Sequence, residues 1–418
     1  MNTLPLFVAA LASLALTEGV TVCYFGSWAV YRPGHGKFDV ENIDPFRCSH
    51  LIYSFAGLTD DNKIKVLDPW NDLCDNYGRC AYDRFTGLKE MNPSLVTLLA
   101  VGGWNEGSAK YSAMAANPAA REIFVKSAIA LLKKHNFDGL DLDWEYPTQR
   151  GGAPADKANF VLLLSELKAA LHANGMMLSA AVSAGKNTID AAYDVPGVAQ
   201  NLDLLNLMTY DFHGAWEPET QHHSALYGQP NDIGANAYLN QDYAVNYWIS
   251  QGMPANKISQ GVPLYGRCWT LSSSLNTGYR APASQPGAAG PYTNQAGFLG
   301  YNEICESIQN NGWTVVNDPV MNEPYVYSIA NNNIWCSYDD QNSLQTKAKY
   351  AKSRGLAGMM VWSIETDDFK GSCGRKFNLI KTLRETYAGR DIFPPITKDN
   401  PTIDLSTRFS IPDATLIQ

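Results

Sequence analysis

Short apolar runs alternate with longer amphipathic stretches along most of the chain. Eight runs have the length and the branched and aromatic content of buried strands: residues 20–28, 50–58, 95–103, 137–145, 177–184, 202–210, 258–264 and 358–363. Stretches between them, such as residues 119–135 and 157–173, repeat apolar residues at the spacing of an amphipathic helix. The pattern therefore predicts strands and helices in alternation.

This alternation predicts an α/β fold in which eight parallel strands close into a (β/α)8 TIM barrel surrounded by helices. A doubly wound open sheet is the alternative, but no Gly-x-Gly-x-x-Gly motif follows an early run to support it. The interval between the seventh and eighth runs is too long for one helix and contains short alternating pieces. We expect a small α+β insertion domain at residues 268–336, with the barrel formed by residues 20–267 and 337–388.

Both ends of the chain differ from this pattern. Residues 4–16 are apolar and are followed by small residues, which predicts a signal peptide over residues 1–19 and a secreted, extracellular protein. The apolar stretch is too short to span a bilayer, and no later stretch is apolar enough, so we expect no membrane association. Residues 389–418 are polar without periodicity and are expected to form a loosely ordered tail.

Secretion changes the interpretation of the eight cysteines. They lack the close pairs of a zinc site, so disulfides are the better interpretation, although eight cysteines allow 105 connectivities. The net charge of −9 and the lack of a basic stripe argue against nucleic-acid binding. The 22 Tyr and 10 Trp suit an uncharged saccharide ligand, although filling a large core explains any one of them equally well.

The chemistry concentrates in residues 137–147, where four carboxylates fall within eight residues. In a strand, Asp141, Asp143 and Glu145 share one face, while the other face carries Leu140, Leu142 and Trp144. Carboxylates at this spacing repel one another and share protons, which raises one pKa. A surface strand with a polar face is the alternative, but the clean alternation with Leu and Trp favours a functional site.

The barrel assigns a depth to each acid, because active sites lie at the carboxyl ends of the strands. Glu145 closes the fourth run and is the candidate general acid at the rim. Asp143 would lie roughly 7 Å behind it along the strand. Asp141 would lie deeper still and share a proton with Asp143.

A second candidate cluster ends the sixth run. Met208 and Tyr210 have the same parity and would face the barrel, with Asp211 at the start of the loop. A Tyr-Asp pair alone is ordinary turn chemistry, but beside the acid strand it becomes a functional candidate. Trp362 ends the eighth run and would be either the floor of a site or a core residue. His213, His222 and His223 form no metal-binding pattern, so we expect no metal and no cofactor.

Asp138-Gly139-Leu140-Asp141-Leu142-Asp143-Trp144-Glu145 resembles the Asp-x-x-Asp-x-Asp-x-Glu signature of glycoside hydrolase family 18, the chitinases and chitinase-like lectins. The resemblance extends over residues 20–387. Within the family, the chain resembles secreted animal chitinases, especially those of arthropods. Six further motifs follow the family's order: Tyr24-Phe25-Gly26-Ser27-Trp28, Leu51-Ile52-Tyr53-Ser54-Phe55-Ala56-Gly57, Val101-Gly102-Gly103-Trp104-Asn105, Met208-Thr209-Tyr210-Asp211-Phe212-His213-Gly214, Pro263-Leu264-Tyr265-Gly266-Arg267 and Met360-Val361-Trp362.

The resemblance implies a substrate-assisted retaining mechanism in which the sugar's own acetamide is the nucleophile. Glu145 would act as general acid and base, and Asp143 would orient the acetamide, with Asp141 beneath it. Tyr210 would bind the acetamide oxygen, and Asp211 would help to hold the distorted sugar. The residues that the resemblance implies for substrate binding are Tyr24, Trp28, Phe55, Gly102, Trp104, Tyr146, Met208, Trp216, Tyr265, Arg267 and Trp362.

The resemblance also implies disulfides Cys23–Cys48 and Cys305–Cys373. We further infer Cys74–Cys80 as a local loop clip and Cys268–Cys336 as a link between the two ends of the insertion. No cysteine follows Cys373, so we expect no cysteine-rich chitin-binding module in this chain.

The sequence thus predicts a monomeric, endo-acting enzyme whose partners are chitin or chitin oligosaccharides. The alternatives are a catalytically silent lectin of the same family and a glycosidase that acts on the N-glycan core. Retention of Asp141, Asp143, Glu145 and Tyr210 favours an active enzyme.

Overall fold

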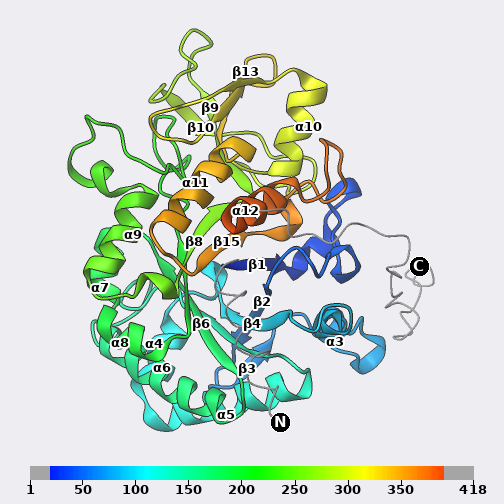
Figure 1. Cartoon of the computed structure of the whole chain (residues 1–418), viewed down its shortest axis with the longest axis vertical. Coiled ribbons are helices and arrows are strands. Elements are labelled where there is room, and N and C mark those ends of the chain that lie inside the picture. Colours follow the sequence, from blue (N-terminus) through cyan, green and yellow to red (C-terminus); the bar gives the residue numbers. More distant parts are fainter. Residues whose placement is uncertain (1–18, 390–418) are drawn as a thin grey trace, which may run out of the picture.

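The computed structural model describes residues 19–389 (Figure 1). The predicted signal peptide, apart from Gly19, and the predicted tail beyond Gly389 lie outside the described residues. Among the described residues, no helix is both long enough and apolar enough to cross a membrane.

Eight parallel strands close into a barrel. They follow one another around it in chain order: β1 (Val20–Gly26), β2 (His50–Leu58), β4 (Val96–Gly102), β5 (Gly139–Asp143), β6 (Met177–Ser183), β7 (Leu204–Met208), β8 (Ile258–Pro263) and β15 (Gly358–Trp362). Strand β1 pairs with both β15 and β2, which closes the sheet. A short strand, β3 (Ile64–Val66), pairs antiparallel with β2. The predicted (β/α)8 barrel is confirmed, and each predicted run contains one barrel strand.

Period-two alternation explains which side chains fill the barrel. Tyr24, Ile52, Leu98 and Met360 belong to one buried cluster contributed by alternate strand positions. The intervening positions pack in a larger cluster between the strands and the helices, and this cluster contains Leu140, Leu142 and Trp144 of the acid segment. Strand β5 therefore points its leucines toward the helices, and its Asp141 and Asp143 project toward the opposite side.

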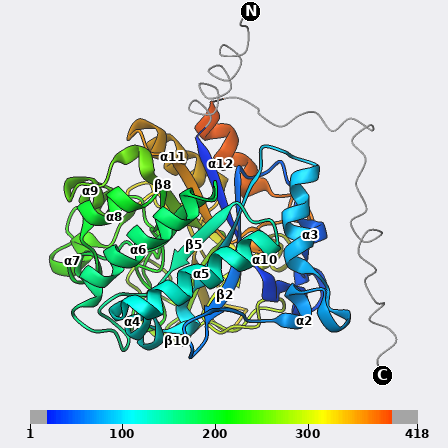
Figure 2. The ribbon, with the colours of Figure 1, turned by 90° about the horizontal axis from the view of Figure 1, so that it is seen from below.

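Helices surround the strands (Figure 2). They are α2 (Pro69–Asp72), α3 (Ala81–Gly87), α4 (Ala109–Ala116), α5 (Pro118–Lys134), α6 (Asp156–His172), α7 (Lys186–Ala192), α8 (Val195–Asn201), α9 (Gln241–Ser250), α11 (Gln341–Ser353) and α12 (Asn378–Ala388). Helix α5 shows how the sequence sets a boundary: Asn117 Oδ1 accepts hydrogen bonds from the backbone N–H groups of Ala119 and Ala120, and Pro118 occupies the first helical position.

Short 3-10 helices occupy many of the connections. They are η1 (Ser27–Tyr31), η2 (Gly34–Gly36), η3 (Val40–Asn42), η4 (Asp75–Tyr77), η5 (Leu88–Glu90), η6 (Trp104–Glu106), η7 (Gly234–Tyr238), η8 (Ala255–Lys257) and η9 (Ile364–Thr366). Two of them, η1 and η6, directly follow β1 and β4 at their carboxyl ends and carry exposed tryptophans.

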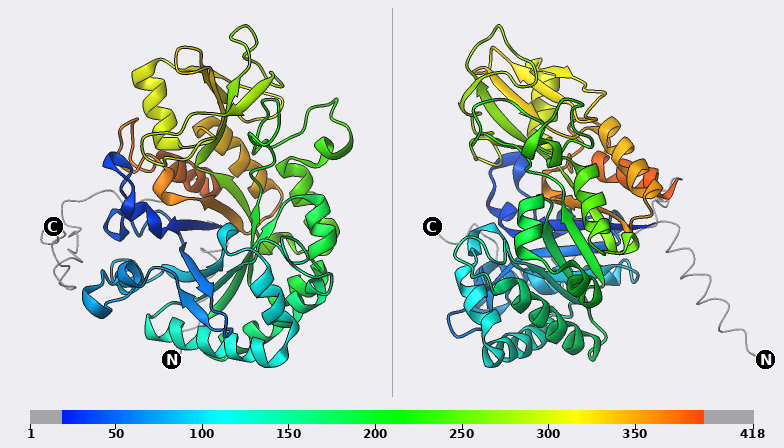
Figure 3. Two further views of the ribbon diagram at one scale, coloured as in Figure 1. Left: turned by 180° about the vertical axis from the view of Figure 1, so that it is seen from behind. Right: turned by 90° about the vertical axis from the view of Figure 1, so that its left-hand side faces the viewer.

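The predicted insertion lies between β8 and β15 and forms a second sheet at one end of the molecule (Figures 1 and 3). Its elements are β9 (Tyr265–Leu271), β10 (Ala283–Pro286), β11 (Phe298–Gly300), α10 (Tyr301–Asn311), β12 (Thr314–Val316), β13 (Tyr325–Ser328) and β14 (Ile334–Ser337). The sheet begins at Tyr265, ahead of the boundary expected at Cys268, because only Leu264 separates β8 from β9.

All eight cysteines are paired, as Cys23–Cys48, Cys74–Cys80, Cys268–Cys336 and Cys305–Cys373. These are the four pairs named above. Cys268 and Cys336 face each other on the paired strands β9 and β14. Cys305 lies in α10, so its bond to Cys373 ties the insertion to the segment that follows β15.

We expect the Cys305–Cys373 bond to contribute more stability than the Cys74–Cys80 bond. The first closes a sequence separation of 68 residues and the second one of only 6. In the chain-entropy account, the double serine variant C305S/C373S loses about 4 kcal/mol of unfolding free energy and C74S/C80S about 2 kcal/mol. Denaturant unfolding of both variants measures the difference, and equal losses would contradict the expectation.

Candidate active site

Asp141 is the deepest acid of β5 and is fully buried. Its Oδ2 accepts a hydrogen bond from the Tyr24 hydroxyl at 2.8 Å, and its Oδ1 accepts from Ser179 Oγ at 2.6 Å and Asn206 Nδ2 at 3.1 Å. Burial raises the pKa of Asp141, whereas these three hydrogen bonds favour its ionised form. Side chains of three other barrel strands, β1, β6 and β7, therefore fix this carboxylate.

Asp143 lies one step nearer the mouth of the barrel and is 3 % exposed. Burial, followed by the charges of Glu145 and Asp141, raises its pKa well above the usual range. Among the described residues, its Oδ1 has no hydrogen-bond partner. The partners of Asp141 are Tyr24, Ser179 and Asn206, and not the expected Asp143. Asp141, Asp143 and Glu145 together form the acid column, in which the pKa values of Asp143 and Glu145 are raised together.

Glu145 lies in a bend beyond β5, because the strand ends at Asp143 and not at the predicted residue 145. Its side chain is partly exposed. Burial raises the pKa of Glu145 to about 7, and the charge of Asp211 adds to the rise, while a hydrogen bond from Tyr146 and the charge of Arg150 oppose it. A partly exposed carboxyl that keeps its proton up to neutral pH is suited to general acid catalysis.

Gly102 sets the position of the acid strand through close contact of two backbones. It pairs with Asp143 across β4 and β5 and has a φ of +118°. A Cβ at this position would lie 2.1 Å from the Asp143 carbonyl oxygen. The next amide, that of Gly103, donates to the same oxygen at 2.8 Å. The absence of a side chain at Gly102 therefore allows the backbones of β4 and β5 to approach this closely at Asp143.

Asp211 follows β7 with its backbone in the left-handed region, at a φ of 58°. Arg267 of β9 holds its carboxylate through two hydrogen bonds, from Nε at 2.7 Å and from Nη2 at 2.5 Å, and the Tyr265 hydroxyl donates at 2.7 Å. Burial alone would raise the pKa of Asp211, but the Arg267 charge outweighs it and lowers the pKa far below its usual range. Asp211 is therefore a fixed anion that joins the barrel to the insertion.

Tyr210 stands beside Asp211 and supplies a hydroxyl group near the acids. Its hydroxyl contacts Met360 Sδ at 3.7 Å. Burial, and then the charges of Asp143 and Asp211, raise its pKa well above the usual range. The phenol therefore stays protonated and can donate a hydrogen bond to a ligand.

Aromatic rings gather at the carboxyl end of β15. Trp362 is partly exposed, and its ring centroid lies 5.7 Å from that of Phe55 and 6.1 Å from that of Trp28. Trp28 is 41 % exposed, and Trp104 and Trp216 are more than half exposed. The Arg150 guanidinium lies 3.5 Å from the centre of the Trp104 ring and donates to the carbonyl oxygens of Trp104 and Glu145.

Comparisons with known proteins agree with this geometry. The model of glycosyl hydrolases family 18 matches residues 20–367. The chain belongs to glycosyl hydrolase family 18. It is 44 % identical to "Probable chitinase 2" of Drosophila melanogaster over 368 residues, which are 86 % of this chain and 74 % of that protein. The relatives that are named chitinases support a glycoside hydrolase.

Two solved structures are similar to this chain and differ in their described functions. The Ostrinia furnacalis Group IV chitinase in complex with allosamidin is similar with a TM-score of 0.85 and 43 % identity, over 89 % of this chain and 99 % of that one. Human YKL-39, described as a pseudo-chitinase with retained chitooligosaccharide binding, is similar with a TM-score of 0.79 and 39 % identity, over 88 % of this chain and 99 % of that one.

The structure of this family 18 member divides the expected substrate-binding residues into two groups. Tyr24 and Tyr265 are 1 % and 2 % exposed, and their hydroxyls bind Asp141 and Asp211. These two tyrosines would therefore affect a ligand through the acids that they bind. The other side chains are partly or more fully exposed around the acids: Trp28, Phe55, Trp104, Tyr146, Met208, Trp216, Arg267 and Trp362.

Two exposed rings were not predicted from the sequence. Tyr31 is 56 % exposed and Trp70 is 49 % exposed, and the rings stack with their centroids 6.4 Å apart. Tyr31 ends the same 3-10 helix that carries Trp28. Its position three residues after Trp28 is the sequence feature from which it could be predicted. Trp70 lies in α2, and its contact with Tyr31 is visible only in the folded chain.

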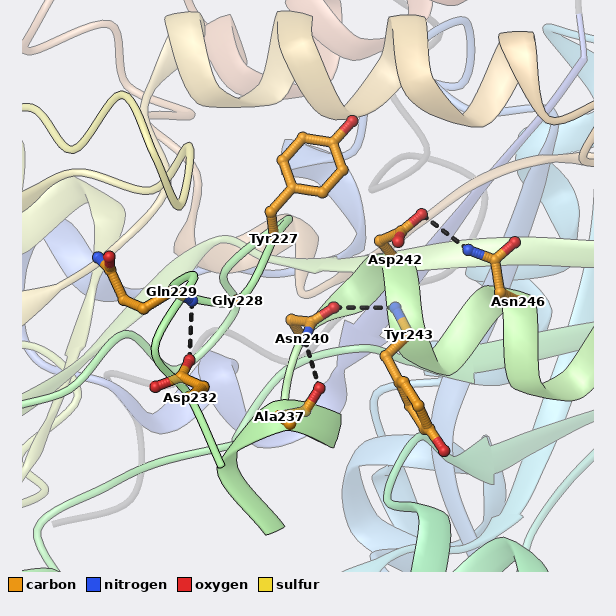
Figure 4. Close-up of a pocket in the computed structure, with 9 residues that line it drawn as sticks. All are labelled: Tyr227, Gly228, Gln229, Asp232, Ala237, Asn240, Asp242, Tyr243 and Asn246. Atoms are coloured by element: carbon orange, nitrogen blue, oxygen red, sulfur yellow. Dashed lines mark hydrogen bonds between the residues drawn. The ribbon is translucent and has the colours of Figure 1, made fainter. Parts of the chain in front are cut away.

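A separate depression lies on the side of the barrel between the loop after β7 and the start of α9 (Figure 4). Its polar side chains are largely paired with one another: Asn240 Oδ1 accepts from the Tyr243 N–H, Asp232 Oδ2 accepts from the Gln229 N–H, and Asn246 donates to Asp242. None of the acids of β5 lines it. We therefore place the chemistry at the acid column and not here.

We expect Gly102→Ala to destabilise the fold and displace Asp143. The added Cβ would overlap the Asp143 carbonyl oxygen, and the positive φ alone costs roughly 1–3 kcal/mol for a residue with a side chain. Gly87→Ala is the matched control, because Gly87 is helical and a Cβ there meets nothing within 4 Å. Unfolding by guanidinium should show a loss for G102A and none for G87A; equal stability of the two variants would refute the interpretation of Gly102.

Proposed function

We propose that the chain is a secreted, endo-acting chitinase that hydrolyses β-1,4 bonds between N-acetylglucosamine units by a substrate-assisted retaining mechanism. The observation that carries the proposal is the graded acid column. Asp141 is held by three donors, Asp143 has an unpartnered oxygen, and Glu145 retains its proton to about pH 7 at the rim. The chitinases among the relatives, one of them bound to allosamidin, support the substrate class.

In this mechanism Glu145 protonates the glycosidic oxygen. The acetamide carbonyl oxygen of the sugar on the non-reducing side attacks the anomeric carbon, the glycosidic bond breaks, and an oxazolinium ion forms. Asp143 accepts a hydrogen bond from the acetamide N–H through its unpartnered Oδ1 and offsets the positive charge. Glu145, now ionised, takes a proton from the water that opens the ring and so restores the acid. No second carboxylate nucleophile is required.

Tyr210 and Asp211 would position the reacting sugar. The protonated Tyr210 hydroxyl would donate to the acetamide carbonyl oxygen, which aligns this oxygen for attack. Asp211 would accept a hydrogen bond from the distorted sugar while Arg267 keeps it ionised. Trp362 would form the floor under the ring, because aromatic faces stack on the apolar face of a sugar.

The arrangement of exposed aromatic side chains supports action within long chains. Trp28, Trp104 and Trp216 remain exposed around the acids, and Tyr31 and Trp70 add a stacked pair beyond Trp28. We infer that these rings bind several consecutive sugar units, with the insertion as one wall of the groove. The four disulfides support an extracellular location. We expect the enzyme to act as a monomer.

The family also contains proteins that bind chitin oligosaccharides without turnover, as the description of YKL-39 states. Glu145→Gln separates the two functions, because the amide is isosteric but cannot donate the catalytic proton. We expect wild-type protein to hydrolyse a chitin oligosaccharide with initial release of the β-anomer, and E145Q to lose activity by roughly 10²–10⁴-fold while it retains binding. NMR of the products early in the reaction measures the anomer. Tight binding without turnover by the wild type would identify a lectin.

The pH dependence follows from the protonation of Glu145. Its pKa is raised to about 7 in the free protein, so the protonated, active form predominates below that pH and is lost as the pH rises above it. We expect kcat/KM to fall about tenfold per pH unit well above pH 7, because one essential proton is lost. Arg150→Gln should shift this limb to higher pH, since removal of a nearby positive charge favours the neutral acid. A shift to lower pH in this variant would contradict the assignment.

A further inference from the structure

A buried polar cluster lies directly behind Asp211, and the proposed mechanism does not use it. It consists of His222, His223 and Glu323, each fully buried. The histidines lie in the loop between β7 and α9, and Glu323 precedes β13 of the insertion. The cluster therefore lies where the barrel and the insertion meet.

The His223 ring stands between two carboxyl groups. Its Nδ1 is 3.5 Å from Asp211 Oδ1, and its Nε2 is 3.7 Å from Glu323 Oε1. The backbone on either side of the ring is fixed, because the His223 N–H donates to Ser337 Oγ at 2.9 Å and its carbonyl accepts from the Phe212 N–H at 3.0 Å. The imidazole therefore faces both acids at distances longer than ordinary hydrogen bonds, and among the described residues neither ring nitrogen has a hydrogen-bond partner.

The surrounding cations are already paired with other acids. Arg267 binds Asp211 through two hydrogen bonds, and Lys347 binds both oxygens of Asp339, at 2.7 Å and 2.6 Å. Glu323 accepts hydrogen bonds only from neutral groups, the Ser337 hydroxyl and the Ser224 N–H, among the described residues. An ionised Glu323 would therefore be a buried charge with no cation bound to it, which is costly.

These ion pairs and hydrogen bonds indicate which atoms of Glu323, His223 and Asp211 carry protons. The lowered pKa of Asp211 keeps it ionised, and its negative charge favours a proton on Nδ1, the imidazole nitrogen that faces it at 3.5 Å. Burial lowers the pKa of His223 to about 4, so the ring is neutral at neutral pH and its other nitrogen is an acceptor. Burial raises the pKa of Glu323 to about 8, although the nearby Lys347 charge opposes the rise, so Glu323 has a proton to donate to that nitrogen.

We propose that His223 is a positioning residue for Asp211, held by Glu323 of the insertion in the tautomer that carries its proton on Nδ1. The line Glu323–His223–Asp211 reaches the carboxylate at Oδ1, the oxygen to which Arg267 Nε also donates. It couples the insertion to the group that would hold the distorted sugar. The consequence for catalysis rests on the proposed function, whereas the tautomer does not.

The other groups near the cluster leave this assignment intact. His222 Nε2 faces Asp318 at 3.3 Å, and its Nδ1 lies 3.9 Å from Glu323 Oε2, the second oxygen of that carboxyl. Tyr265 donates to Asp211 Oδ1 from the side, and its ring centroid lies 5.2 Å from that of His223. Asp211 receives hydrogen bonds from Arg267 and Tyr265, and His223 Nδ1 faces the same Oδ1 at 3.5 Å.

Two variants of His223 separate positioning from packing. In His223→Asn, the side-chain amide can occupy the place of Nδ1 and still donate to Asp211; His223→Leu fills similar space without a donor. We expect H223L to lower kcat/KM on a chitin oligosaccharide by about tenfold or more, mainly in kcat, because a misplaced group lowers the population of the reactive geometry. We expect H223N to stay within about threefold of wild type. Wild-type activity in H223L, or equal losses in both variants, would overturn the proposal.

The tautomer is measured without reference to activity. Long-range ¹H–¹⁵N spectra of the ¹⁵N-histidine-labelled protein near pH 6.5 distinguish protonated from unprotonated ring nitrogens, and the spectrum of H223N identifies the His223 signals among the seven histidines. We expect a neutral ring with its proton on Nδ1, both in wild type and in Glu323→Gln, whose amide also donates to Nε2. A proton on Nε2, or a charged ring, would overturn the proposal even if H223L fails to fold. A wild-type chain with this tautomer but no hydrolysis would contradict the proposed function alone.

Discussion

The site is organised by the free-energy cost of burying the acid column, Asp141, Asp143 and Glu145, inside a barrel. Removing an ionised carboxylate from water is unfavourable unless hydrogen bonds or an opposite charge replace the lost hydration. Asp141 is compensated by Tyr24, Ser179 and Asn206, whereas Asp143 Oδ1 has no hydrogen-bond partner within residues 19–389. The two positions differ because the interior of the barrel supplies donors only at the deeper level. This difference favours protonation of the acids nearer the mouth of the barrel, where a reaction that needs a proton donor can use them.

The same constraint has a different solution at Asp211. This acid receives a full positive charge from Arg267, and its pKa falls although burial opposes the fall. Arg267 belongs to β9, so the ionisation of a barrel residue depends on the first strand of the insertion. The insertion therefore contributes to the electrostatics of the site as well as to its walls. The pKa values of Asp211 and Asp143 shift in opposite directions because Asp211 receives a cation, whereas Asp143 is more deeply buried and receives the charges of Glu145 and Asp141.

Local periodicity was sufficient to predict the architecture and the acid column. Each barrel strand was visible as an apolar run, and the parity of Asp141 and Asp143 followed from period two. The contacts that set the chemistry were not visible, because they join distant residues: Tyr24 and Asp141 are 117 positions apart, and Arg267 and Asp211 are 56 apart. Family resemblance placed Tyr24 and Arg267 near the substrate, but only the folded chain shows that they bind acids. Gly102 is similar, since its function depends on a backbone contact and a φ value that composition does not encode.

Fold alone does not decide between hydrolysis and binding. Human YKL-39 superposes on this chain with a TM-score of 0.79 and is described as a pseudo-chitinase. The same fold can therefore accompany either function, so the side chains of the site must be considered. In this chain the rim position is a carboxyl group whose pKa lies near neutrality because it is buried beside other acids. Burial is the largest cause of this raised pKa and the charge of Asp211 adds to it, so the acidity of Glu145 depends on the segment after β7 as well as on its own segment after β5.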